Sequence, residues 1–285
     1  TLATLLTPAT ASAATLTLRE GVAGYAGTSD ATIEEANPAT NLGDDDRVQV
    51  FGQLGDPEDQ SERAVVRFDL TDVPRGSDVT SASVTFTSAD PGQDIEAYAV
   101  LEDWDEDEVT WNEASTGTAW STAGVEGAAR GATPIGAAAV GAVGTPVELT
   151  LDLATVQGWV DEPSTNFGFV LISTDNNDGA HLYSSERFDE TQRPQFNIEY
   201  DAPEPVVVST ASPLPGGTVD SAYSTTLAAT GGTGPYTWAV TAGSLPAGLS
   251  LAADGSLTGT PTEDGTFNFT VTATDTFDAT GSKAL

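Results

Sequence analysis

The sequence of 285 residues contains no cysteine, no methionine and a single histidine. Without cysteine, the chain cannot form disulfides, zinc–thiolate sites, iron–sulfur clusters or a cysteine nucleophile. A single histidine also excludes histidine-rich metal sites and any catalysis that needs a pair of histidines. The chain therefore cannot be an enzyme or metalloprotein whose function depends on these groups.

Positive charge is also scarce, since nine basic residues face 43 acidic ones and the formal net charge is −34. Binding nucleic acid or membrane phosphates requires clustered Lys and Arg, so neither partner is expected. No apolar run approaches the ~20 residues of a membrane span, and we expect no direct membrane insertion. Such an acidic surface keeps a protein soluble in brine and attracts hydrated cations. A saline habitat is the first explanation and calcium loading the second.

The first 13 residues have the pattern of a secretory signal peptide. Three leucines precede Pro8 and the small-x-small sequence Ala11-Ser12-Ala13. We expect residues 1–13 to be a signal-peptide remnant, with a disordered N-terminus as the alternative. At the other end, residues 281–285 resemble the start of a strand. The chain is therefore expected to be secreted and covalently continuous with further domains of a longer protein, which could be attached to a cell surface.

The length suggests about two domains. The boundary is a proline-rich segment, residues 201–207, of the kind that forms a short, semi-rigid linker. Acidity divides unevenly there, because residues 1–202 contain 36 of the 43 acidic side chains. We therefore predict one domain over residues 14–200 and a second over residues 208–285.

The first domain is predicted to be an all-β jelly-roll sandwich. Several segments alternate apolar and polar residues with a period of two, as half-buried antiparallel strands do. They are residues 64–70, 79–87 and 147–153, and two segments that are apolar on both faces, 95–101 and 167–172, are expected to be central. One short helix is expected over residues 154–160, with Asp152 as its cap. The Gly- and Ala-rich stretch 117–144 is expected to be a long surface loop.

The second domain alternates in the same way over residues 236–240 and 267–272, with glycine-containing turns between the strands. About 80 residues with this rhythm are typical of an immunoglobulin-like β-sandwich. Trp238 occupies an alternating apolar position, so we expect it to lie in the core of this domain.

Several short motifs in the first domain together carry a family resemblance. They are Asp30 to Ile33, Asn41-Leu42-Gly43, Glu62 to Asp69, Trp104-Asp105-Glu106, Val109-Thr110-Trp111-Asn112, Asn166-Phe167-Gly168 and Ser184-Ser185-Glu186. Their order and spacing resemble the DNRLRE family over roughly residues 25–200. That family consists of secreted β-sandwich modules related to carbohydrate-binding modules. The resemblance implies a place beside polysaccharide lyases, glycosidases or cell-surface proteins, and some members bind acidic polysaccharides such as alginate.

The second domain carries a different set of motifs, among them Gly234-Pro235-Tyr236-Thr237-Trp238, Leu245 to Leu251 and Gly255 to Pro261. This string resembles the immunoglobulin-like, cadherin-like repeats of bacterial surface proteins. The resemblance implies a spacer or adhesive unit that occurs in tandem, in some cases with calcium at the junctions.

Candidate contacts with carbohydrate come from the few tryptophans and arginines of the first domain. Sugars stack on exposed aromatic rings, and Trp120, in the expected surface loop, is the best candidate for exposure, followed by Trp104. Arg63 and Arg67 could each form paired hydrogen bonds with a uronate carboxylate. The alternative for Arg67 is an ion pair with Asp69 or with an acid on a neighbouring strand. The acidity of this domain repels a polyuronate unless calcium bridges the two.

Calcium is the expected cofactor, because closely spaced oxygen ligands suit it. Asp175, Asn177 and Asp178 lie in a segment whose composition resembles a calcium loop, although it fails the EF-hand pattern. The alternative is an Asn- and Asp-rich hairpin turn.

No motif supports catalysis, since His181 has no Ser or Cys motif around it and no phosphate-binding loop is present. The predicted function is a secreted, non-enzymatic module that binds a polysaccharide or cell-surface glycan. The alternative is a structural stalk or adhesin array, stiffened by calcium, that recognises no glycan. An exposed aromatic and polar groove would favour the first function, and burial of every tryptophan in the first domain would favour the second.

Overall fold

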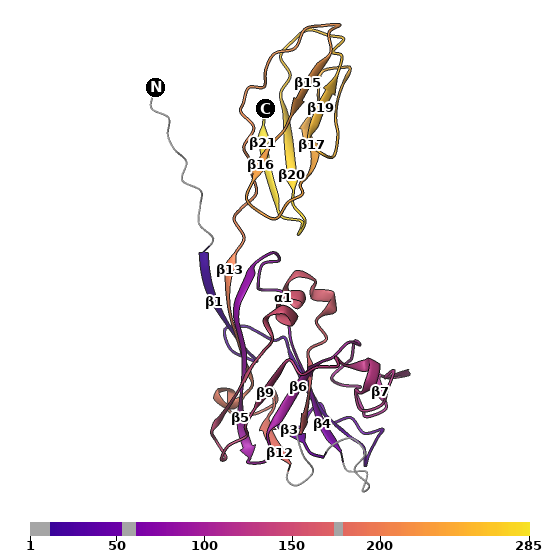
Figure 1. Ribbon diagram of the computed structural model, residues 1–285, viewed down its shortest axis with the longest axis vertical. Coiled ribbons are helices and arrows are strands. Elements are labelled where there is room, and N and C mark those ends of the chain that lie inside the picture. The colour runs from indigo at the N-terminus through magenta and orange to yellow at the C-terminus, as the bar shows by residue number, and fades with distance from the viewer. Residues whose placement is uncertain (1–11, 53–60, 174–178) are drawn as a thin grey trace. The chain divides into compact units, whose positions relative to one another are not determined.

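A computed structural model describes residues 12–52, 61–173 and 179–285. The chain divides into two compact units, with the boundary between Asp201 and Ala202. Regular structure in both units consists almost entirely of antiparallel strands (Figure 1), which confirms the all-β prediction.

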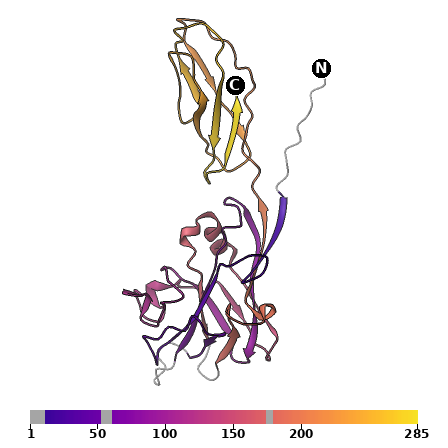
Figure 2. The ribbon, with the colours of Figure 1, turned by 180° about the vertical axis from the view of Figure 1, so that it is seen from behind.

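The first unit, up to Asp201, is a sandwich of two antiparallel sheets (Figures 1 and 2). The β5 sheet runs in the order β1 (Ser12–Arg19), β13 (Gln195–Ala202), β5 (Asp78–Asp90), β12 (Ala180–Tyr183) and β3 (Arg47–Val50), and β10 (Pro146–Thr150) also pairs with β5. The β4 sheet runs in the order β2 (Thr28–Glu34), β4 (Glu62–Phe68), β11 (Phe169–Ser173), β6 (Ile95–Ala99) and β9 (Gly136–Ala138). Successive strands mostly cross from one sheet to the other, as in the predicted jelly roll.

The main core lies between the facing sides of the two sheets. Phe68 packs against Phe196 with ring centroids 5.4 Å apart, and Phe86 meets Phe169 edge-on at 6.5 Å. The predicted helix is present as α1 (Leu153–Asp161), and Asp152 caps it by accepting the N–H of Thr155 at 2.9 Å. Short 3-10 turns occur at η1 (Gly127–Ala129), η2 (Pro163–Thr165) and η3 (Glu190–Gln192).

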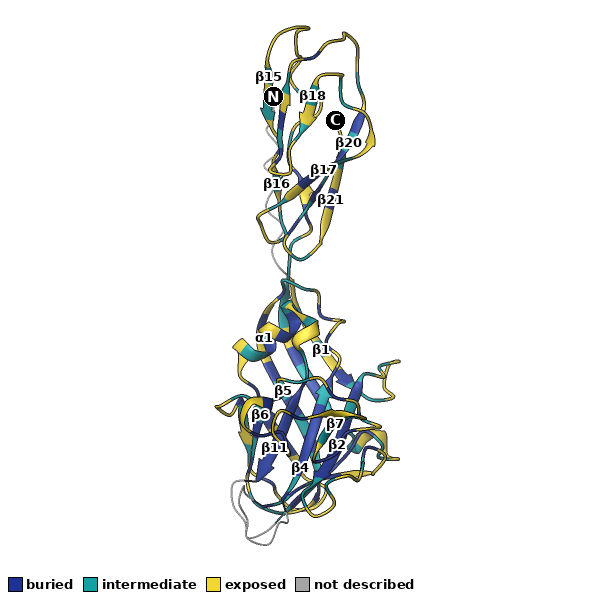
Figure 3. Cartoon of the chain, turned by 90° about the vertical axis from the view of Figure 1, so that its right-hand side faces the viewer, coloured by how far each residue is buried: buried dark blue, intermediate teal, exposed yellow. Residues whose placement is uncertain are grey.

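A second core covers the outer face of the β4 sheet. Val65 and Val170 point outward from the sheet, and both are fully buried beneath the segment that follows β6. This segment includes β7 (Glu113–Ser115) and β8 (Thr118–Ala119), and in Figure 1 β7 lies on the side of the unit away from β5. The dark blue of β4 and β11 in Figure 3 follows from burial on both faces.

The prediction that residues 117–144 form a surface loop is therefore wrong. Its buried apolar side chains are Trp120, Val125, Ala129, Ile135 and Val140, and η1 and β9 lie within it. These apolar residues are spaced singly among Gly and Ala, so they give no helical or strand period. Trp120, Val125 and Ala129 nevertheless cover the outer face of the β4 sheet, because an apolar sheet face must be buried against something, and Ile135 and Val140 join the main core.

The second unit is the predicted immunoglobulin-like sandwich of short strands. They are β14 (Val207–Val208), β15 (Tyr223–Thr226), β16 (Ala229–Thr230), β17 (Thr237–Gly243), β18 (Leu249–Leu251), β19 (Ser256–Gly259), β20 (Phe269–Thr274) and β21 (Thr280–Ala284). β17, β20 and β21 form one sheet, β15, β19 and β18 another, and β14 pairs with β16. Trp238 is 6% exposed and packs in the core of this unit, as predicted.

Candidate functional site

The two tryptophans that were predicted to contact sugar are buried in the second core. Trp104 is 3% exposed and donates its indole N–H to the carbonyl of Phe167 at 2.8 Å. Trp120 is 4% exposed and donates to the carbonyl of Thr110 at 3.0 Å. The exposure expected for Trp120 is wrong, because its loop folds back on the β4 sheet. Neither ring offers a face on which a sugar could stack.

Arg63, a second predicted contact, has a fully buried side chain on the outer face of β4. Its Nη1 lies 2.7 Å from Oε1 of Glu126 and also donates to the carbonyl of Gly124. The guanidinium carbon is 4.9 Å from the ring centroid of Trp111. Burial lowers the pKa of Arg63, and the neighbouring Glu126 opposes that shift. Arg63 therefore holds the second core together and cannot reach a carbohydrate.

Arg67 is the one member of the predicted set that reaches solvent. Its side chain is 27% exposed, its Nη1 lies 2.9 Å from Oδ1 of Asp103, and its guanidinium stands 5.1 Å from the ring centroid of Trp104. The predicted alternative, an ion pair with an acid, is thus present, but with Asp103 and not with Asp69. The carboxylate of Asp69 instead accepts the N–H of Thr71 at 2.8 Å.

An exposed aromatic does occur in the first unit, in the loop between β12 and β13. Phe188 is 97% exposed, and among the described residues it is the only aromatic side chain with such exposure. Next to it, the guanidinium of Arg187 stacks 4.0 Å from the ring centroid of Tyr183 and forms an ion pair of 2.6 Å with Asp46. Sequence reasoning missed Phe188, because one phenylalanine in a polar loop belongs to no periodic pattern.

Three carboxylates from distant parts of the chain meet at one place in the first unit. Asp30 lies on β2, Glu106 in the turn that follows Trp104, and Glu186 in the loop after β12. One carboxylate oxygen from each lies within 4.8 Å of the others, and this is the group of potential metal ligands found among the residues described.

Backbone contacts hold these segments together. The N–H of Asp30 donates to Oε1 of Glu106 at 2.7 Å, and the N–H of Ser185 donates to Oδ2 of Asp30 at 2.9 Å. Asn41 donates its side-chain amide to the carbonyl of Glu106 at 2.7 Å. Gly43 packs directly against the same carbonyl, since a Cβ at this position would lie 2.4 Å from that oxygen. A larger residue at position 43 would therefore displace the turn that carries Glu106.

The electrostatics of this cluster disfavour three bare negative charges. Burial raises the pKa of Asp30 well above its ordinary value, and the charge of Glu186 adds to the shift. Burial also raises the pKa of Glu106 to about 7 and raises that of Glu186. All three shifts have burial as their largest cause, which means that the charged forms have lost water and gained too little in return.

The predicted calcium ligands Asp175, Asn177 and Asp178 lie outside the described residues. That site stays a prediction.

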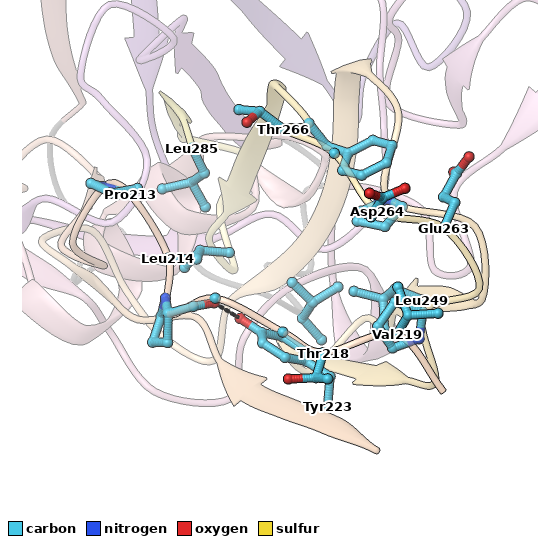
Figure 4. A pocket seen from close by; sticks show the side chains of 18 of the residues that line it. Pro213, Leu214, Thr218, Val219, Tyr223, Leu249, Glu263, Asp264, Thr266 and Leu285 are labelled. Carbon is cyan, nitrogen blue, oxygen red and sulfur yellow. Dashed lines mark hydrogen bonds between the residues drawn. The ribbon is translucent and has the colours of Figure 1, made fainter. Parts of the chain in front are cut away.

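A pocket of about 640 Å³ lies in the second unit. Prolines and apolar side chains line much of it, including Leu214, Tyr223 and Leu285 (Figure 4). The hydroxyl of Tyr223 donates to the carbonyl of Pro215 at 3.0 Å, as the dashed line in Figure 4 shows. The polar tip of this ring is thus already bonded within the unit.

Comparison with protein families decides the identity of the first unit. Residues 22–200 match the model of carbohydrate-binding module family 96. The chain belongs to this family. The predicted resemblance to carbohydrate-binding-module-like β-sandwich domains is confirmed, and the family 96 module coincides with the jelly-roll sandwich. Modules of this kind are in general non-catalytic and are typical of extracellular proteins.

The family 96 module is followed by an immunoglobulin-like domain, since residues 204–285 match the family model described as "Putative Ig domain". Among solved structures, the chain is similar to the C-terminal 282-residue fragment of intimin, in complex with the translocated intimin receptor intimin-binding domain. The identity is 14% and the TM-score 0.22, and the match covers 79% of this chain and 56% of the intimin fragment. A TM-score this low does not establish a shared arrangement. No curated protein matches the chain.

None of the described helices has the length and apolar character needed to cross a membrane.

Proposed function

We propose that the first unit is a non-catalytic module that binds a polysaccharide or cell-surface glycan and attaches a larger secreted protein to it. The observation that carries this proposal is the match of residues 22–200 to a carbohydrate-binding family. The immunoglobulin-like second unit suits a spacer or adhesive role beside it.

The loop between β12 and β13 is the proposed contact with the glycan. A fully exposed phenyl ring offers the apolar face on which a pyranose can stack, and Phe188 supplies that ring. Arg187 stands beside it, and because its guanidinium is stacked on Tyr183 it can donate to sugar hydroxyls from a fixed position. Arg67 is the second proposed contact, since its guanidinium remains partly open to solvent.

The charge of the first unit limits which glycans it can bind. Residues 1–202 contain 36 acidic and eight basic side chains, so a polyuronate would be repelled at low salt. A neutral glycan, or a contact bridged by calcium, meets less repulsion. The expected ligand class is therefore a neutral polysaccharide, with alginate binding only when calcium is present.

The rival function, a stalk that recognises no glycan, is favoured by a separate observation. All four tryptophans of the first unit are buried, namely Trp104, Trp111, Trp120 and Trp159. The module therefore lacks the exposed tryptophan platform that would mark a sugar-binding face.

A glycan array distinguishes the two functions. The full chain would be tested on alginate, pectin, xylan, chitin and cellulose in high salt, with calcium and then with chelator. We expect binding to one glycan that falls about two- to tenfold in Phe188→Ala, since stacking on an aromatic contributes about 0.5–1.5 kcal/mol and every ~1.4 kcal/mol is tenfold in affinity. Val143→Ala, which also shortens an exposed apolar side chain, is the matched control and should bind normally. Failure to bind any glycan in either condition would support the stalk.

A further inference from the structure

The buried side chain of Asp30 keeps one carboxylate oxygen without a hydrogen-bond partner. Asp30 is directly opposite Val66 in the pairing of β2 with β4, so its side chain points from the inner face of the sheet into the sandwich. Asp30 is 1% exposed, and its Oδ2 accepts the N–H of Ser185. Its Oδ1 is buried and accepts nothing. A buried oxygen in this state is costly unless a ligand bonds to it.

The residues around Asp30 add further negative charge, although its buried carboxylate needs a positive charge to balance it. Glu106 and Glu186 bring their own carboxylates to within 4.8 Å, and Oε2 of Glu186 is also buried without a partner. Arg193 is the cation whose charge acts on Glu186. Its guanidinium is already used, however, because Nε donates to the carbonyl of Arg187 and Nη1 to that of Glu20. Two buried carboxylate oxygens without a partner thus belong to a group of three acids whose ligand oxygens lie within 4.8 Å of one another.

Both the spacing of these carboxylate oxygens and their chemistry fit calcium. Ca²⁺ is held by oxygen ligands at about 2.3–2.6 Å, so two ligands on opposite sides of one ion lie up to about 5 Å apart. The 4.8 Å limit among the three carboxylates falls inside that diameter. Mg²⁺ binds its ligands at about 2.0–2.1 Å in a near-ideal octahedron and gives up its water reluctantly, so a set of three carboxylates from separate segments suits it less well. Carboxylates from three segments also offer the several oxygens that calcium requires.

We propose that Asp30, Glu106 and Glu186 bind one calcium ion in the first unit. The ion would join β2, the turn after Trp104 and the loop after β12, in addition to the hydrogen bonds that already link these segments. This site is separate from the segment of Asp175, Asn177 and Asp178. Its ligand Glu186 directly precedes Arg187 and Phe188, so the ion would also hold the loop that carries the proposed glycan contact.

The test is a calcium titration of the full chain after removal of metal with chelator. Isothermal titration calorimetry in about 1 M NaCl shortens the Debye length to about 3 Å and so suppresses diffuse binding to the acidic surface. We expect one saturable site, with weaker binding of Mg²⁺. Asp30→Asn and Glu186→Gln should each lower calcium affinity at least tenfold, since even loss of a residue that only supports a ligand costs about 10–100-fold. The matched control is Glu148→Gln on β10, where the side chain is exposed, and it should leave the affinity unchanged.

Several outcomes would overturn the proposal. They are the absence of a saturable calcium site in the unmodified chain, an affinity that Asp30→Asn and Glu186→Gln leave as high as in Glu148→Gln, and magnesium binding as tight as calcium binding. If Asp30→Asn fails to give a native near-UV circular dichroism spectrum, Glu106→Gln replaces it, because Glu106 is only half-buried. A heat-denaturation series with and without calcium gives a second readout, in which the rise in melting temperature caused by calcium should disappear in the same variants.

Discussion

Asp30 in the first unit and Asp275 in the second are both buried, at 1% and 7% exposure, yet their carboxylates differ in the number of hydrogen-bond donors that they contact. Asp275 accepts three backbone N–H groups, from Phe277 and Ala279 on Oδ1 and from Thr233 on Oδ2, all at 2.8–2.9 Å. Asp30 accepts one N–H group, keeps an oxygen without a partner and faces two further acids. The backbone N–H groups around Asp275 are enough to stabilise its buried charge. The buried charge of Asp30 needs a cation, or the carboxyl must take up a proton.

This difference shows how to choose among the acidic residues of a very acidic chain. With 43 carboxylates, their number and local clustering say little about where an ion binds. Asp30 combines an unused buried oxygen with two further acids close by, whereas Asp275 has a full set of donors. The contrast fails if the energetic cost of an unbalanced charge in this protein does not depend on burial, or if substitutions at Asp30 and Asp275 have equal effects.

The largest effect is expected where a buried charge loses its partner. Glu126→Gln would leave the fully buried guanidinium of Arg63 without its counter-ion. Breaking a buried ion pair costs about 3–5 kcal/mol, so we expect a loss of about 3 kcal/mol in the free energy of unfolding. Urea unfolding followed by tryptophan fluorescence measures it, with the exposed Glu148→Gln as control. A loss below about 1 kcal/mol would mean that an uncompensated buried charge is tolerated in this fold, and the argument from Asp30 would weaken.

Removal of the satisfied carboxylate should have the next largest effect. Asp275→Ala would leave three N–H groups without their acceptor, two in the turn after β20 and one, of Thr233, in the turn before β17, at a cost of about 2–3 kcal/mol. Asp275→Asn retains one acceptor oxygen and should cost about half as much. Hydrogen exchange locates the effect, since protection should fall at the amides of Thr233, Phe277 and Ala279. Unchanged protection there would show that these hydrogen bonds do not stabilise the turn.

The same substitution at Asp30 should behave differently. In chelator, Asp30→Asn removes a charge that nothing balances while Asn can still accept the N–H of Ser185. We therefore expect the free energy of unfolding to rise or to change by less than about 1 kcal/mol. Urea titrations with chelator and then with calcium measure both states, and in calcium the variant should be the less stable protein. A loss above about 2 kcal/mol in chelator would make Asp30 a structural residue like Asp275.

The strands could be predicted from the sequence where apolar and polar side chains alternate along the chain. The period of two in residues 64–70 and 147–153 locates β4 and β10, and Asp152 followed by an apolar run locates α1. The burial of Trp120 could not be predicted in this way. It lies in an aperiodic, Gly- and Ala-rich stretch, and it is buried only because the outer face of the β4 sheet is apolar and needs cover.

The acidic cluster was beyond prediction for a related reason. Asp30, Glu106 and Glu186 each lie in one of the short motifs that carry the family resemblance, which was the one available signal. They are far apart in the sequence, however, and only the folded sandwich brings the three motifs together. Arg63 and Arg67 were equally indistinguishable in sequence, since both lie on the same face of β4, yet one is enclosed by the second core and the other stands at its edge.

The smallest loss of stability is expected for a substitution of Arg67. It is the reference with which the loss in Glu126→Gln is compared. Arg67→Gln breaks an ion pair with Asp103, whose side chain is 75% exposed, and weakens a contact with the ring of Trp104. Exposed pairs contribute about 0–1 kcal/mol, because water already solvates both charges and salt screens them. We expect a loss below 1 kcal/mol that shrinks further in high salt, measured by the same urea titration as for Glu126→Gln. Equal losses for the two variants would show that burial does not set the cost of an unbalanced charge in this protein, and the contrast between Asp30 and Asp275 would then lose its energetic basis.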